Sequence, residues 1–145
     1  MQQRDYTVEE KVRMVAEDAG IAYAFMDWAT ANVAIEQGQL PLMLYVQPAS
    51  GTINVEDMQI TDSPQCMLAV MDKCELDGDG KGNDNVIERC KAIAYKFIEH
   101  LNDSTLFAPI QGSVKYSVFY DRLDVNVCGV TFELTLRERQ GYCTL

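Results

Sequence analysis

The stretch 83–101, NDNVIERCKAIAYKFIEHL, is the strongest structural signal in the sequence and predicts one amphipathic helix. Its apolar side chains recur at spacings of three and four residues, which gathers them on one helix face: Val86, Ile87, Cys90, Ile93, Ala94, Phe97, Ile98 and Leu101. Asn85 and Glu88 have the spacing of a capping box, so we expect them at the first turn. A helix of this length is marginal alone in water, so it must pack against another element.

The first forty residues predict a shorter helix followed by a short extended segment. Thr7 and Glu10 form another capping box, and the apolar spacing after them predicts a helix that ends at Gly20. Beyond it, periodicity does not separate a strand from a continued helix. We expect an extended segment over 22–26 and a loose helical turn or loop up to Gly38.

The remaining segments predict strands, which are 42–48, 52–61, 65–73, 113–121 and 125–139. We expect the first two to pair as a hairpin, 65–73 to be a central strand because it is apolar on both sides, and the last two to pair through a short connection at 122–124. Alternation places two sets of side chains on strand faces: Val114, Tyr116, Val118 and Tyr120, and Cys128, Val130, Phe132, Leu134 and Leu136. The sequence therefore predicts a single α+β domain over 1–145, with an antiparallel or mixed sheet of about five strands and two helices packed on one face.

Charge and composition exclude some classes of function. The chain has 22 acidic and 12 basic residues and a net charge of −10, which disfavours adhesive binding to nucleic acid or to an anionic membrane. Its apolar runs are too short to cross a bilayer, and residues 1–20 do not resemble a signal peptide. The number of cysteines is odd, which favours reduced thiols over a disulfide framework for Cys66, Cys74, Cys90, Cys128 and Cys143.

The loop before the main helix partly matches a calcium-binding loop. Four positions of that template are occupied, by Asp77, Asp79, Gly82 and Glu88. Lys81 stands where an oxygen ligand is needed, and the loop follows a predicted strand instead of a helix. We therefore expect a solvated strand-to-helix connection and no metal, with Asp77, Asp79 and Glu88 as weak candidates should calcium bind.

Few residues are candidates for catalysis. The single histidine, His100, suits the C-terminal end of the main helix, where the helix dipole favours a cation. Its pairing with Cys90 or Cys128 as a thiol nucleophile is a minor alternative. No phosphate-binding or dinucleotide fingerprint occurs, so we expect no cofactor and no enzyme. Tyr23, Phe25 and Trp28 could mark a binding surface, although core or subunit interface is the more common role of such a cluster.

The closing stretch 116–143, YSVFYDRLDVNVCGVTFELTLRERQGYC, together with the helix VIERCKAIAYKFIEHL, resembles the tail terminator and tail-completion proteins of tailed phages. The likeness is to those in phages or prophages of gut Bacteroidales. Its motifs are Ile87-Glu88-Arg89-Cys90 in the helix and Gly129-Val130 with Leu136-Arg137 in the final strands. The resemblance covers about 40–140, and the loop 75–84 departs from the pattern.

The resemblance implies a non-enzymatic virion protein that forms a ring, commonly a hexamer, at the neck, the head-proximal end of the tail. Such a ring ends tail-tube assembly and joins the tail to the head connector, while DNA passes without specific binding. Its partners would be further copies, the tail-tube protein and connector or adaptor proteins, and it would assemble in the bacterial host cytoplasm. The alternatives are another head–tail adaptor or injection-system component, or a calcium-binding, small-ligand or thiol-enzyme domain. For a ring, the loop 75–84 and the edge of the strand 125–137 are the interface candidates.

Overall fold

The structure is a computed structural model that describes residues 6–35, 39–74, 81–120 and 126–137. Its elements are α1 (Val8–Asp18), β1 (Tyr23–Met26), α2 (Trp28–Ala34), β2 (Leu42–Val46), β3 (Ser50–Glu56), β4 (Gln59–Lys73), α3 (Lys81–Asp103), β5 (Tyr116–Phe119) and β6 (Val127–Thr135). The α+β class is confirmed. The described sheet has six strands, one more than the approximate number that we expected.

The sheet is mixed and is built around β4, its longest strand. Five strands follow the order β1-β2-β4-β6-β5, and β3 pairs with β4 outside that path. β1 runs parallel to β2, whereas every other described pair is antiparallel. The central position predicted for 65–73 is confirmed, because this half of β4 lies between β2 and β6. The strand begins six residues earlier than predicted, at Gln59.

The hairpin predicted between 42–48 and 52–61 is wrong. β3 pairs with the first half of β4 from Ser50–Gln65 to Glu56–Gln59, so the segment 52–61 contains a hairpin of its own. β2 instead pairs with the second half of β4 and with β1. The physical reason is a two-residue turn at Asp57 and Met58, both with positive φ, which lets the chain reverse inside what the sequence pattern presents as one strand.

The two predicted helices pack on one face of the sheet as expected, and a third helix, α2, covers the other face. α1 and α3 pack on the face that includes Met43, Leu68 and Val130. α2 lies over the opposite face, where Ala31 and Ile35 pack in a second cluster around Leu44. The two clusters follow from strand alternation, because neighbouring residues of β2 and β4 point to opposite faces.

The amphipathic helix is confirmed as α3, and its predicted apolar stripe is buried or packed against the core. The cap predicted at Asn85 is wrong, because α3 begins four residues earlier, at Lys81. Asp84 lies in the first turn, where the positive end of the helix dipole favours a carboxylate. At α1 the predicted capping box is present: Thr7 Oγ1 accepts from the Glu10 amide and the Glu10 carboxylate accepts from the Thr7 amide, both at 3.1 Å.

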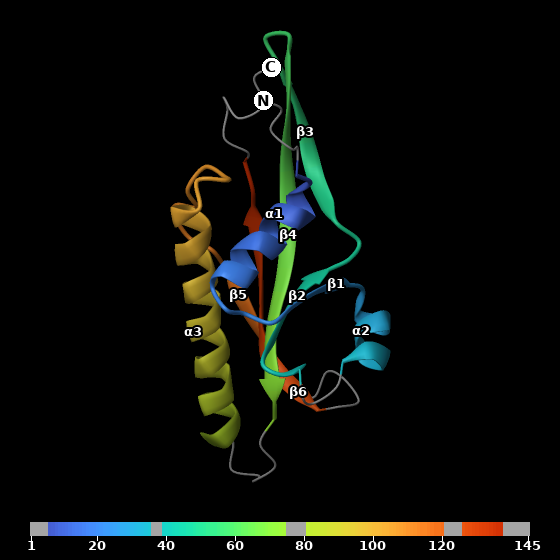
Figure 1. The fold of residues 1–145 in the computed structure, drawn as a ribbon, viewed down its shortest axis with the longest axis vertical. Helices are drawn as coiled ribbons and strands as arrows, with labels where there is room; N and C mark the ends of the chain where they lie inside the picture. Colours follow the sequence, from blue (N-terminus) through green and yellow to red (C-terminus); the bar gives the residue numbers. More distant parts are fainter. Residues whose placement is uncertain (1–5, 36–38, 75–80, 121–125, 138–145) are drawn as a thin grey trace.

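The last two strands pair as predicted, although β5 is only four residues long and the connection 122–124 lies outside the described residues. The predicted inner face of β6 is buried throughout. Gly129 sits against the backbone of Val70 on β4, where a Cβ would collide. Figure 1 shows α3 running beside β4 and the β3–β4 hairpin rising beyond the helices at one end of the long axis. Among the described helices, none is long and apolar enough to cross a membrane.

Candidate functional site

The β3–β4 hairpin, residues 50–65, is the most exposed regular element of the described chain. Its register pairs Val55 with Ile60 and Ile53 with Asp62, so these side chains share one face. On that face Ile53 is 73% exposed, Val55 70% and Ile60 73%, while Met58 at the tip is 100% exposed. We call these four residues the hairpin surface.

The other face of the hairpin is polar. Thr52, Asn54 and Glu56 alternate with the apolar residues of β3, and the Asn54 side-chain amide donates a 2.9 Å hydrogen bond to Ser63 Oγ. At its base the hairpin is tied to the sheet, because the Leu136 amide donates to the carbonyl oxygen of Pro64 at 2.8 Å. A short polar face and an anchored base hold the apolar face in a defined orientation.

The turn at the hairpin tip carries a conformational cost. Asp57 has φ 48° and Met58 has φ 65°, the left-handed region required at both positions of a type I′ turn. Asparagine and glycine are favoured there, whereas a long side chain such as methionine is not. Met58 therefore combines an unfavourable backbone conformation with a wholly exposed side chain.

A second exposed apolar area lies at the far edge of the sheet, on β5 and the neighbouring turn of α3. Tyr95, Tyr116 and Tyr120 are each just over half exposed, and Val118 is also exposed. The ammonium group of Lys91 lies 5.0 Å from the ring centroid of Tyr116, and a hydrogen bond with Tyr116 raises the pKa of Lys91. We call Tyr95, Tyr116, Val118 and Tyr120 the tyrosine surface.

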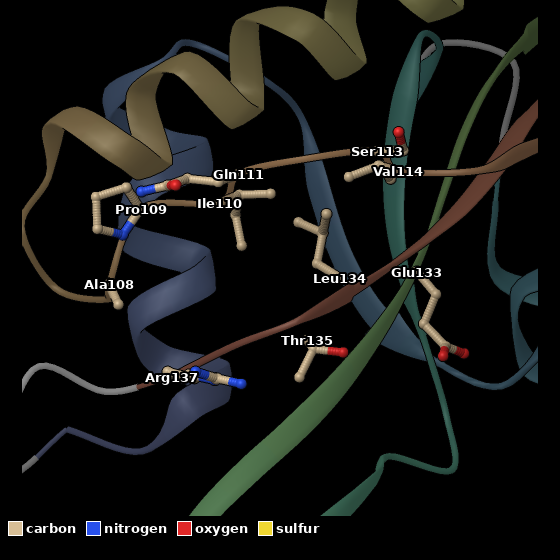
Figure 2. A pocket seen from close by; sticks show the side chains of 10 residues that line it. All are labelled: Ala108, Pro109, Ile110, Gln111, Ser113, Val114, Glu133, Leu134, Thr135 and Arg137. Atoms are coloured by element: carbon tan, nitrogen blue, oxygen red, sulfur yellow. The ribbon is translucent and has the colours of Figure 1, made fainter.

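A cleft of about 540 Å³ lies where β5 separates from β6. β5 pairs with β6 only from Gly129 to Phe132, and beyond that point the segment 108–114 runs at a distance from the strand. Figure 2 shows the side chains of Ile110 and Leu134 directed toward one another across this cleft. β5 is the terminal strand at this end of the described sheet, and beyond Phe132 the edge of β6 lines the cleft. The interface expected at the edge of 125–137 stays a prediction.

The calcium-loop candidates are only partly described. Asp77 and Asp79 lie outside the described residues. Glu88 lies inside α3, is exposed, and its Oε1 is 3.5 Å from the Lys91 Nζ. No group of three or more potential ligands for a metal occurs among the described residues. The calcium hypothesis stays a prediction, and the helix over Lys81–Glu88 is not the loop geometry that the template requires.

The described cysteines are buried, and none of them forms a disulfide with another: Cys66, Cys74, Cys90 and Cys128. Burial raises the pKa of Cys66 and of Cys90 to about 12, which keeps both protonated near neutral pH. His100 lies ten residues beyond Cys90 along α3, a rise of roughly 15 Å, and its Nδ1 lies 3.1 Å from Asp18 Oδ2 on α1. The structure therefore separates His100 from Cys90. Cys143 lies outside the described residues.

The aromatic residues near the N-terminus do not form one surface. Phe25 packs on Tyr45 with 4.8 Å between ring centroids, and the Tyr23 hydroxyl donates a 3.0 Å hydrogen bond to Glu9. Trp28 packs on Phe119 across the opposite face of the sheet. All three are partly buried and pack against the two core clusters, which agrees with the first of the two roles that we expected, core or subunit interface.

Sequence reasoning missed the hairpin surface. Ile53, Val55 and Ile60 alternate with polar residues as in a half-buried strand, and nothing in that pattern separates a core face from an exposed one. The available signal for a tight turn was symmetry: Val55 and Ile60 lie at equal distances along the sequence on either side of residues 57–58.

A comparison with protein-family models and with curated proteins found no match for the chain.

Proposed function

We propose that this protein is a structural subunit that assembles through its hairpin surface into a ring, commonly a hexamer, at the neck of a phage tail. In this role it ends tail-tube polymerisation and joins the tail to the head connector, and it catalyses no reaction. The phage assignment comes from the resemblance of 40–140 to tail terminator proteins. The assembly itself is supported by the structure of the hairpin.

The observation that carries the proposal is the uncovered apolar face of the hairpin. The hairpin surface is exposed on a narrow two-stranded arm. This arm extends beyond α1 and α3 (Figure 1). An isolated hairpin of this kind gains stability from packing against other elements, and large exposed apolar areas mark interaction surfaces. None of the described residues covers this face, and the proposal assigns its cover to another copy of the chain.

The position of the hairpin at one end of the molecule is compatible with a ring (Figure 1). A protruding arm binds a different surface of its neighbour, which is a heterologous contact, and heterologous contacts either close into rings or continue as filaments. The net charge of −10 supports a passage for DNA, since an acidic wall repels phosphates and keeps DNA from adhering.

The proposal is tested with the purified chain and the tail-tube protein encoded by the same phage. Light scattering should give one discrete oligomer, and electron microscopy should show rings at one end of tubes whose growth has stopped. The variant Val55→Lys should lose both properties, whereas Val33→Lys, which changes an exposed valine on α2, should keep them. A wild-type chain that neither forms an oligomer nor binds the tube would overturn the proposal.

A further inference from the structure

We propose that the hairpin of one copy is received by β5 of the next, with the open edge of β3 adding to the open edge of β5. The hairpin surface then covers the tyrosine surface of its neighbour. This inference rests on the ring assembly proposed above and assigns the two surfaces that meet in it.

Both strands have an open backbone edge. Among the described strands, β3 pairs only with β4, and β5 pairs only with β6. An open edge presents a row of amide and carbonyl groups that another strand can pair with. Pairing of β3 with β5 would satisfy both rows and would extend one sheet across the two chains.

The apolar faces of the two strands fit each other in such a sheet. Ile53 and Val55 share one face of β3, and Tyr116 and Val118 share one face of β5. Side chains on the same face of neighbouring strands lie about 5 Å apart at the Cβ atoms, so edge pairing brings the two pairs into contact. Tyr95, on α3, flanks the same face and would close over the pairs.

The charges of the two surfaces are complementary. The segment 42–72 contains no lysine or arginine, and the hairpin carries the carboxylates of Glu56, Asp57 and Asp62. On the receiving side Lys91 lies against Tyr116, and Lys115 directly precedes β5. In a chain with only 12 basic residues, two lysines beside an apolar surface favour an acidic partner strand.

The two surfaces supply more than half of the area that a specific contact needs. The hairpin surface exposes on the order of 600 Å², and the tyrosine surface on the order of 500 Å², against about 800 Å² per partner in a standard interface. Backbone and polar-face contacts along the paired edge supply the remainder. Tyrosine is also enriched among the residues that dominate binding at interfaces.

The other terminal strand of the sheet, β1, fits less well. Its side chains are already packed within the chain, with Tyr23 and Phe25 on one cluster and Ala24 and Met26 on the other. It therefore offers a backbone edge without an exposed apolar surface. Of the two terminal strands, only β5 offers both an open backbone edge and an exposed apolar surface.

A mixing experiment tests the assignment. Val55→Lys disables the hairpin and Val118→Lys disables β5, and each variant alone should be monomeric, with a dissociation constant raised at least about thirtyfold. In an equimolar mixture, the intact hairpin of the second variant meets the intact β5 of the first, so a 1:1 dimer that grows no further should form. Val33→Lys is the matched control and should assemble like the wild type.

Each other outcome has a distinct meaning. If Val118→Lys assembles like the wild type while Val55→Lys does not, the ring proposal stands and the assignment of β5 is overturned. A mixture that stays monomeric overturns it as well. If the wild-type chain itself never assembles, both proposals are overturned together.

Cross-linking gives a second, positional readout. In a Cys143→Ser background, a chain with Val55→Cys mixed with a chain carrying Val118→Cys should form an intermolecular cross-link with a short bifunctional maleimide. The matched control replaces Val118→Cys by Ala24→Cys on β1 and should give none. Equal or stronger cross-linking to position 24 would place the hairpin on β1 and contradict the proposal.

Discussion

Replacing Met58 with glycine should make the isolated chain more stable and its assembly weaker. Met58 has φ 65°, and a non-glycine residue in the left-handed region costs about 1–2 kcal/mol. Glycine removes that cost but adds about 0.4–1 kcal/mol of entropy to the unfolded chain. The net gain in the free energy of unfolding is about 0.5–1 kcal/mol, which corresponds to a rise in Tm of about 2–3 °C for a chain of this size.

The effect on assembly has the opposite sign. Met58 is wholly exposed in the single chain, so any burial of its side chain occurs in the assembly. Loss of a buried methionine side chain removes about 2 kcal/mol, which raises the dissociation constant of the contact about thirtyfold. One substitution therefore separates the stability of the chain from the strength of the contact.

The assay for stability is urea unfolding at a concentration where the chain is monomeric. The fluorescence of Trp28, which packs 5.9 Å from Phe119 between ring centroids, reports the fold. Light scattering at higher concentration reports assembly. Asp57→Asn is the matched control, because it suits the same turn and leaves the methionine in place. A glycine variant with lower stability would refute the strain argument, and unchanged assembly would refute the role of Met58 in the contact.

Three further predictions concern the fold. Gly129→Ala should lower the free energy of unfolding by roughly 2–3 kcal/mol in urea titrations, because its Cβ would collide with the Val70 backbone; a loss below half that value would contradict the close approach. Thr7→Ala should cost about 1 kcal/mol through loss of the α1 cap, whereas an unchanged urea midpoint would show that the cap adds nothing. Cys66 and Cys90 have a pKa of about 12 in the folded chain and an ordinary value of 9.0, so unfolding releases protons above pH 9. Stability should then fall as pH rises from about 9 to 12, by up to about 1.4 kcal/mol per pH unit for each thiol, and a level urea midpoint over this range would contradict the burial of these groups.

Periodic signals in the sequence predicted the elements that lie against the core. The apolar stripe of α3 and the alternating face of β6 are buried as expected, because a core-facing surface imposes a period of 3.6 or 2 residues on the sequence. The cap of α1 was also predictable, since its side-chain and backbone bonds are local. These features need only the residues within one element.

Strand pairing was not predictable from the same signals. The turn at Asp57 and Met58 lacks the glycine or asparagine that marks a hairpin turn, so the sequence pattern predicts one strand over 52–61. The second core cluster, under α2, was not predicted, because α2 is only seven residues long and contributes few apolar residues. Pairing and layering depend on contacts between distant segments, which periodicity does not encode.

The candidate site was the least predictable feature. Ile53 and Val55 have the pattern of a core strand, and only the fold shows that they are exposed on a hairpin that extends beyond the helices (Figure 1). The loop 75–84, the other predicted interface, lies largely outside the described residues. A surface made for an assembly has the composition of a core, and the single sequence does not distinguish the two.

The most direct test of the account is the mass of the chain in solution, measured by light scattering at two concentrations with calcium and with chelator. The account predicts a discrete oligomer that is indifferent to calcium and is lost in the Val55→Lys variant. A monomer under all conditions, or an oligomer that Val55→Lys leaves intact, would contradict assembly through the hairpin surface.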